Sequence, residues 1–146
     1  MPRRLPSSFG SPDESPGWVL CMAAHAWQRR LRAALEPLAL TPAQASLLAA
    51  VVWLGRDDAP LTQTRIARHA RTDPMMTSQV LRALEGKKLV RRLPHPSDTR
   101  ARLLRPTARG RKLAREAAFA TERVDREFFE SLGDPGRLRG QLSELL

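Results

Sequence analysis

The sequence predicts a mainly helical fold with one small β-hairpin, and three observations support this. Apolar residues recur at steps of three and four along most of the 146-residue chain, which is the period of an amphipathic helix. Proline follows a serine, threonine or aspartate at several places, a pattern that marks helix starts. Between residues 89 and 104, two short apolar runs flank a proline-rich turn, as in a pair of strands. The length suits a single domain.

An N-terminal arm precedes the first two helices. Residues 1–15 are rich in Pro, Ser and Gly, so we expect a flexible arm and not a signal peptide, which needs an apolar stretch. Periodic apolar residues predict a helix from Pro16 that stops or kinks at Pro37. The Thr-Pro-Ala-Gln sequence at 41–44 is a capping box that opens a second helix, which Gly55 can end.

Two short helices joined by a tight turn come next. Thr62 can cap the first of them, which runs to about Ala70. Asp73 and Pro74 supply the cap and first position of the second, which runs to about Lys87. This is the helix-turn-helix pattern, in which the second helix enters the major groove of DNA.

A β-hairpin and two further helices complete the prediction. Residues 89–93 and 101–104 form the strands, joined by a basic, turn-rich segment. A hairpin after a helix-turn-helix is a wing, so we expect residues 41–106 to form a winged helix-turn-helix region. Thr107 caps a long helix that breaks at residues 133–135, before a short last helix.

The terminal helices, within residues 16–40 and 107–146, carry apolar stripes that a lone winged region does not need. Packed across a two-fold axis, these stripes would bury a shared core, and we expect them to be dimerisation helices of a homodimer. The alternative is that they fold back on their own chain as the core of a monomer.

Basic residues are concentrated in the middle of the chain. The formal net charge is +10, but residues 59–115 hold 15 Lys or Arg against three acids, a net of +12. The chain uses 22 arginines and 3 lysines, and this general preference explains which basic residue is used. It does not explain why this segment has so few acidic residues. Such a segment is the electrostatic footprint of a polyanion, and nucleic acid is the partner it indicates.

Two other classes of protein are excluded. The single cysteine, Cys21, rules out an internal disulfide framework and is typical of a reducing compartment. The longest apolar run, Leu47 to Leu54, has eight residues, well below the roughly 20 that span a bilayer. We therefore expect a cytoplasmic protein, associated with the nucleoid, that has no membrane segment.

The second helix of the helix-turn-helix has two distinct faces. Its inward positions form one stripe: Thr77, Val80, Leu81 and Leu84. Its outward positions are Met75, Ser78, Gln79 and Arg82. Serine, glutamine and arginine hydrogen-bond base edges or phosphates, and methionine can touch a thymine methyl. These four are the predicted DNA contacts of the helix, and an ordinary solvated face is the alternative.

Several segments carry a family resemblance. They are Leu40–Gln44, Leu61–Gln63 with Ile66–Ala67, Val80–Glu85, Leu89–Arg92, Asp98–Ala101 and Thr107–Arg111. In this order and spacing they resemble the MarR family of winged-helix transcription regulators, over about residues 18–145. The resemblance implies a homodimer that binds a pseudo-palindromic operator in double-stranded DNA and usually represses transcription.

The resemblance also assigns roles to individual residues. It places the helix from Pro74 in the major groove and Arg100, at the wing tip, in the minor groove, where a narrow A·T stretch concentrates negative potential. Asp98 resembles the aspartate that anchors the wing. Four further arginines would contact phosphates or attract DNA as it approaches: Arg91, Arg92, Arg102 and Arg105.

Two positions depart from the family pattern. Lys88 stands where glycine is common, so a left-handed backbone there would cost about 1 kcal/mol, unless Gly86 ends the helix earlier. Pro106 stands where an apolar strand residue is usual, so we expect the second wing strand to end early.

Two sites can receive a regulatory signal. Cys21 is placed like the thiol of the family's organic-peroxide sensors, with His25 one turn on, although the chain has no tyrosine to hold a thiolate. Ordinary packing is the alternative. We expect an effector pocket near the first, second and fifth helices, with Trp27 and Trp53 lining it and His25 or Arg30 meeting a small phenolic or anionic ligand. The alternative is that these four residues belong to the core and the surface and bind no ligand.

No metal, cofactor or catalytic site is indicated. The three histidines are far apart, without paired His or Cys spacing, and there is no glycine-rich phosphate loop. His95, Ser97 and Asp98 share a tight loop with no scaffold to orient a catalytic triad. The sequence predicts a sequence-specific repressor, released by a small molecule or an oxidant, and not an enzyme. The alternatives are an architectural DNA-binding protein of low specificity and a protein-interaction adaptor.

Overall fold

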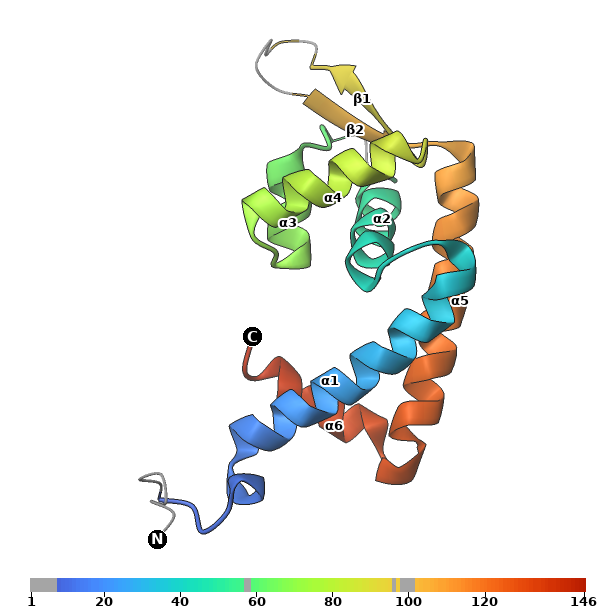
Figure 1. The fold of residues 1–146 in the computed structure, drawn as a ribbon. Helices are drawn as coiled ribbons and strands as arrows, with labels where there is room; N and C mark the ends of the chain where they lie inside the picture. The colour runs from blue at the N-terminus through green and yellow to red at the C-terminus, as the bar shows by residue number, and fades with distance from the viewer. Residues whose placement is uncertain (1–7, 57–58, 96, 98–101) are drawn as a thin grey trace, which may run out of the picture.

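The computed structural model describes residues 8–56, 59–95, 97 and 102–146, and its fold class is the predicted one (Figure 1). The α-helices are α1 (Pro16–Leu35), α2 (Pro42–Leu54), α3 (Gln63–Ala70), α4 (Pro74–Gly86), α5 (Ala108–Phe129) and α6 (Pro135–Ser143). The strands are β1 (Val90–Pro94) and β2 (Arg102–Pro106), and short 3-10 helices occupy Pro12–Glu14, Glu36–Leu38 and Glu130–Leu132.

Side-chain caps begin four of these helices where the sequence predicts them. Gln44 N donates to Thr41 Oγ1 at 3.2 Å and Thr41 N donates to Gln44 Oε1 at 3.3 Å, which completes the capping box of α2. The side chains of Thr62, Asp73 and Thr107 accept hydrogen bonds from the first turns of α3, α4 and α5. Each cap satisfies backbone N–H groups that have no partner inside the helix.

Helix α2 lies at the centre of the core. Its buried residues are Ala45, Leu47, Leu48, Ala50, Val51 and Leu54. It packs against α1, α3, α4, α5 and β2, so it contacts nearly every other element of the chain. Because full burial of a leucine contributes about 2 kcal/mol, this one helix supplies much of the free energy that fixes its neighbours.

The wing is a two-stranded ribbon. Strand β1 pairs antiparallel with β2, with Val90 opposite Pro106, and one isolated bridge joins Thr62 to Leu103. The expectation that Pro106 ends the second strand early is wrong, because the strand includes Pro106, which is buried. The missing N–H costs no ladder bond there, because the donor at this end of the ribbon is the next residue, Thr107, whose N–H donates to Leu89 O at 3.0 Å.

The turn between α4 and β1 contains a left-handed residue. Lys88 has a φ of 58°, so a lysine occupies a conformation that favours glycine, at a cost of about 1 kcal/mol. Thr107 Oγ1 lies 2.9 Å from Lys88 O and 3.2 Å from Leu89 O, and it can donate to either carbonyl. The cap of α5 therefore also braces this turn.

Helices α1 and α5 pack against each other and extend away from the winged region, with α6 at the same end (Figure 1). Within α1, only Leu31 and Leu35 are buried, and α6 has no buried residue. Trp18, Val19 and Leu20 are between 47% and 49% exposed. The core of this chain thus uses the C-terminal half of α1 and leaves its N-terminal half uncovered.

No single helix in the described ranges is long and apolar enough to cross a membrane. The segments 16–38 and 42–54 reach that length and composition only as a pair, and the pair is bent by 71°.

The close approach of α5 to Leu89, in the turn before β1, depends on Gly110. A Cβ placed on Gly110 would lie 2.0 Å from Leu89 O. We expect Gly110→Ala to lower the free energy of unfolding by about 2–3 kcal/mol, because backbone must move to admit the methyl group. Urea denaturation measures this.

Gly86→Ala is the matched control. Its Cβ would meet no atom within 4 Å, and alanine favours a helix over glycine by up to about 1 kcal/mol. Equal destabilisation by the two substitutions would contradict the assigned contact.

Candidate nucleic-acid interface

Helix α4 presents one face to the core and the other to solvent. The inward residues Thr77, Leu81 and Leu84 are fully buried, and Val80 is half-buried. The outward residues are Met75 (71% exposed), Gln79 and Arg82, with Ser78 half-buried at their edge. The structure thus gathers the four sequence-predicted contacts on one accessible side of α4. Their contact with DNA stays a prediction.

Hydrogen bonds at the N-terminus of α4 hold its position. Asp73 Oδ1 accepts from the backbone N–H groups of Met75 and Met76 at 2.9 Å each. Thr77 Oγ1 donates to Asp73 O at 2.8 Å, so Thr72 is the donor in the 2.8 Å contact between the Thr72 and Thr77 hydroxyls. This hydrogen-bonding role of Thr77 adds to the packing role that the sequence predicts. The signal for this contact was a polar side chain within an otherwise apolar inward stripe.

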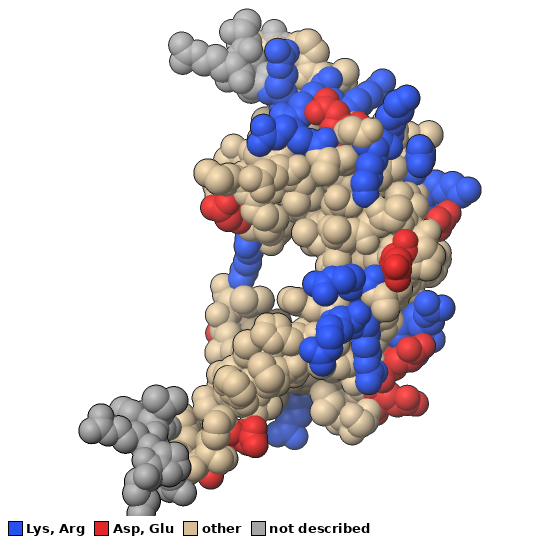
Figure 2. All heavy atoms as spheres, in the orientation of Figure 1, with Lys and Arg blue, Asp and Glu red and all other residues tan. Residues whose placement is uncertain are grey.

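Positive charge lies beside this face. Figure 2 shows Lys and Arg side chains gathered over the wing and the adjoining end of α4, with few acidic neighbours. A second basic group lies lower in the same view and is interleaved with Asp and Glu. Basic side chains outnumber acidic ones in the first group, and such an excess of positive charge is the arrangement that attracts a phosphate backbone.

The wing arginines fall into two kinds. Arg91 and Arg102 are exposed, as a phosphate contact requires. Arg92 is half-buried, and its Nε lies 3.1 Å from Glu85 Oε2 on α4. An arginine paired in this way holds β1 against α4, so we now interpret Arg92 as a positioning residue. Glu85, one of three acids in the basic segment, was the signal that sequence analysis overlooked.

Two predicted wing residues, Asp98 and Arg100, lie outside the described residues. The structure therefore leaves their roles as predictions.

Lys87, at the C-terminal cap of α4, connects this helix to the corner between α1 and α2. Its Nζ donates to Ala39 O and, at 2.8 Å, to Gln44 Oε1. Ala39 has a left-handed backbone, with a φ of 52°, and Gln44 belongs to the capping box of α2. One ammonium group thus ties the end of α4 to the start of α2, a link between segments far apart in sequence that no local pattern indicates.

An open cavity of about 530 Å³ lies between α1, α2 and α5, close to the predicted position of an effector pocket. Its lining residues are Trp27, Gln28, Leu31, Pro42, Ala43, Ala45, Ser46, Ala49, Ala114, Ala117, Ala118, Thr121 and Glu122. Of the four residues predicted to form a pocket, Trp27 lines this cavity and His25, Arg30 and Trp53 do not.

The other predicted sensor residues have separate surroundings. Cys21 and His25 are both exposed on α1, with Sγ 3.8 Å from Nε2. The guanidinium of Arg30 lies 5.1 Å from the ring centre of Phe128. Trp53 is 59% exposed and stacks with Arg56. In the part of the chain that the structure describes, no three His, Cys, Asp or Glu side chains come together as a metal site would require.

Comparison with known proteins identifies similar sequences. The model of the MarR family matches residues 40–101. The uncharacterized HTH-type transcriptional regulator YdcH of Bacillus subtilis is 34% identical over 140 residues, covering 96% of this chain and 95% of that protein. The HTH-type transcriptional repressor Rv2887 of Mycobacterium tuberculosis is 31% identical over 128 residues, covering 87% of this chain and 89% of its own.

Solved structures show the same fold. The transcriptional repressor CouR bound to a 23-mer DNA duplex is 30% identical, with a TM-score of 0.78 and coverage of 97% of this chain and 96% of that one. A mutant of Escherichia coli MarR complexed with operator DNA has a TM-score of 0.81 at 22% identity, covering 95% and 99%. The second likeness speaks for the fold alone.

Proposed function

This chain belongs to the MarR family of DNA-binding transcriptional regulators, and from that premise we propose that it is a homodimeric, sequence-specific repressor. We place its action in the cytoplasm, on chromosomal DNA. The observation that carries the proposal is the exposed polar face of α4 beside a surface on which basic side chains predominate. Two similar proteins that are named as repressors, Rv2887 (31% identical) and CouR (30% identical), support repression over activation.

In this proposal α4 enters the major groove. Gln79 and Arg82 project from the middle of its exposed face, where an amide can read adenine and a guanidinium can read guanine. Met75 offers an apolar contact to a thymine methyl, and Ser78 a hydroxyl to a base or phosphate. Arg91 and Arg102 contact phosphates, and Arg100 enters the minor groove.

The dimer is inferred from uncovered apolar surface at the end away from the wing. Large exposed side chains there are Trp18, Val19, Leu20 and Met22 on α1. Phe119 on α5 is exposed as well, as are Leu145 and Leu146 after α6, where Leu146 O accepts from Arg71 Nη1 at 2.7 Å. Apolar groups gathered at one end of a chain mark an interaction surface. A second copy covering them would bury both sets at once and present two α4 helices to successive turns of DNA.

Regulation is proposed to act through the cavity between α1, α2 and α5. Its wall includes Pro42 and Ala43 in the first turn of α2, and Gln44 in that same turn accepts from Lys87 of α4. A ligand that shifts this turn would therefore shift the end of α4. The 3.8 Å approach of Cys21 to His25 supports oxidation of the Cys21 thiol as the alternative signal, and retention of the parent's peroxide response by Cys21→Ser would show that this thiol is structural.

Base reading by α4 is tested with Gln79→Ala. We expect binding to a duplex selected by the protein from random sequence to weaken by about 1–3 kcal/mol, since a bidentate base contact is lost. Binding to unselected duplex should change little. Fluorescence anisotropy on both duplexes gives the two affinities.

Gln141→Ala, the same change at an exposed position on α6, is the control. Equal losses on both duplexes would remove Gln79 from base reading. Parent protein that prefers the selected duplex by much less than about 10³-fold would favour the architectural alternative.

The positioning role of Lys87 is tested with Lys87→Met. Loss of its two hydrogen bonds should weaken binding to the selected duplex roughly three- to tenfold, because α4 is less well fixed. The dependence of log affinity on log salt should keep its slope, because no phosphate contact is lost.

Lys112→Met is the charge-matched control, since Lys112 lies on α5 and only approaches Glu116, at 3.9 Å. A slope that falls by about one unit for Lys87→Met would instead identify Lys87 as a phosphate contact.

A further inference from the structure

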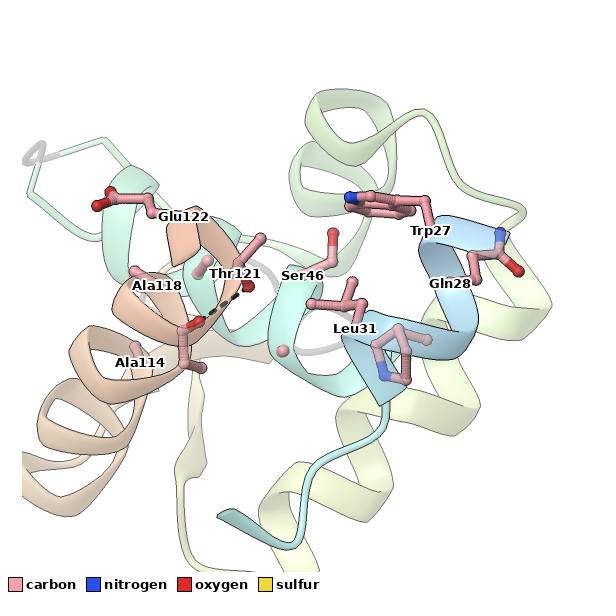
Figure 3. Close-up of a pocket in the computed structure, with 13 residues that line it drawn as sticks. Trp27, Gln28, Leu31, Ser46, Ala114, Ala118, Thr121 and Glu122 are labelled. Atoms are coloured by element: carbon pink, nitrogen blue, oxygen red, sulfur yellow. Dashed lines mark hydrogen bonds between the residues drawn. The ribbon is translucent and has the colours of Figure 1, made fainter. Parts of the chain in front are cut away.

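The cavity between α1, α2 and α5 has walls that are mostly methyl groups. Six of its thirteen lining residues are alanines, on α2 and α5. Small side chains on packed helices leave space that no neighbour fills, which is why a cavity of about 530 Å³ remains. That volume lies within the range of small-molecule sites. Figure 3 shows Trp27 and Gln28 on one side, Ala118 and Thr121 on the other, and Ser46 between them.

Trp27 contributes an aromatic face and no hydrogen bond. Its Nε1 donates to Asp125 Oδ1 at 2.7 Å, which fixes the plane of the indole and occupies its one polar atom. The ring is therefore what Trp27 offers to a ligand, and a second aromatic ring packs well on such a surface.

Within the described residues, the lining of the cavity includes no group that would neutralise an anion. None of the lining residues is Lys, Arg or His, and the one charged residue among them is Glu122. The cations that sequence analysis assigned to a pocket lie elsewhere, with Arg30 against Phe128 and His25 beside Cys21. A carboxylate or phenolate entering here would lose hydration without gaining a counter-charge, which is costly.

The remaining polar groups of the cavity favour a ligand that donates hydrogen bonds. Thr121 Oγ1 gives its proton to Ala117 O at 2.8 Å, so towards the cavity it can only accept. Glu122 accepts as well, at the exposed rim. Ser46 and Gln28 can act either way.

From these observations we infer that the cavity binds a planar aromatic ligand that is neutral or carries one positive charge, and that it discriminates against anions. The inference rests on the proposed function only in taking this cavity as the regulatory one. It replaces the phenolic or anionic effector expected from the sequence.

The test uses three probes that share one ring and differ in charge: 2-naphthylmethylammonium, naphthalene-2-carboxamide and naphthalene-2-carboxylate. Calorimetric titration of the full chain with each probe gives the dissociation constants. The ammonium and the amide bind, and the carboxylate binds at least about tenfold more weakly.

Substitutions in the lining of the cavity test whether the probes bind there. Ala118→Leu fills the cavity from α5 and Ser46→Leu fills it from α2, both at exposed positions that tolerate a larger side chain. Either one abolishes binding of the ammonium and the amide. Glu122→Gln weakens the ammonium about two- to fivefold, as expected for an exposed ion pair, and leaves the amide unchanged. Glu116→Gln, on α5 but outside the cavity, changes neither.

Binding of the ligand-free protein to its selected duplex is measured in parallel. The inference about the ligand is overturned if the carboxylate binds as tightly as the ammonium, or if no probe binds at millimolar concentration. If binding to the selected duplex is intact in that case, the proposed function as a DNA-binding regulator is unaffected. If the protein binds the probes as described but does not prefer the selected duplex over unselected duplex, the proposed function is overturned and the inferred class of ligand is unaffected.

Discussion

The burial of α2 is the constraint on which the rest of the structure depends. This helix is apolar on almost every side and contacts α1, α3, α4, α5 and β2, so none of them can move far without exposing it. Its exposed positions are few, and three of them, Ser46, Ala49 and Trp53, follow one another on a single face. The first two line the cavity. Helix α2 is therefore both the centre of the core and the floor of the proposed regulatory site.

The same helix connects that site to the DNA-binding face through a short polar route. The capping box that begins α2 uses Gln44, and the amide oxygen of Gln44 also accepts from Lys87 at the end of α4. On the other side of α4, Glu85 pairs with Arg92 of the wing. Charged side chains thus fix α4 at its C-terminal end to the corner between α1 and α2 and to the wing. In our proposal, a change in the first turn of α2 is passed on to both elements that are proposed to contact DNA.

The sequence is most informative where structure is local. Caps at Thr41, Thr62, Asp73 and Thr107 follow from neighbouring residues, and so does the outward set on α4, because helical period alone separates it from the buried stripe. Contacts across the fold were not predictable in this way. The Lys87–Gln44 and Arg92–Glu85 pairs join distant segments, and the cavity exists because alanines on separate helices face one another. Pro106 was misjudged because its effect depends on lying at a strand end.

In the proposed mechanism, two copies of this chain join through their terminal helices and together present paired α4 helices and wings to one duplex. Sedimentation equilibrium of the full chain, alone and with a labelled duplex that it has selected, tests this most directly. We expect a dimer at micromolar concentration and a complex of two chains per duplex. A monomer that binds the duplex singly, or a dimer that dissociates on binding, would contradict it.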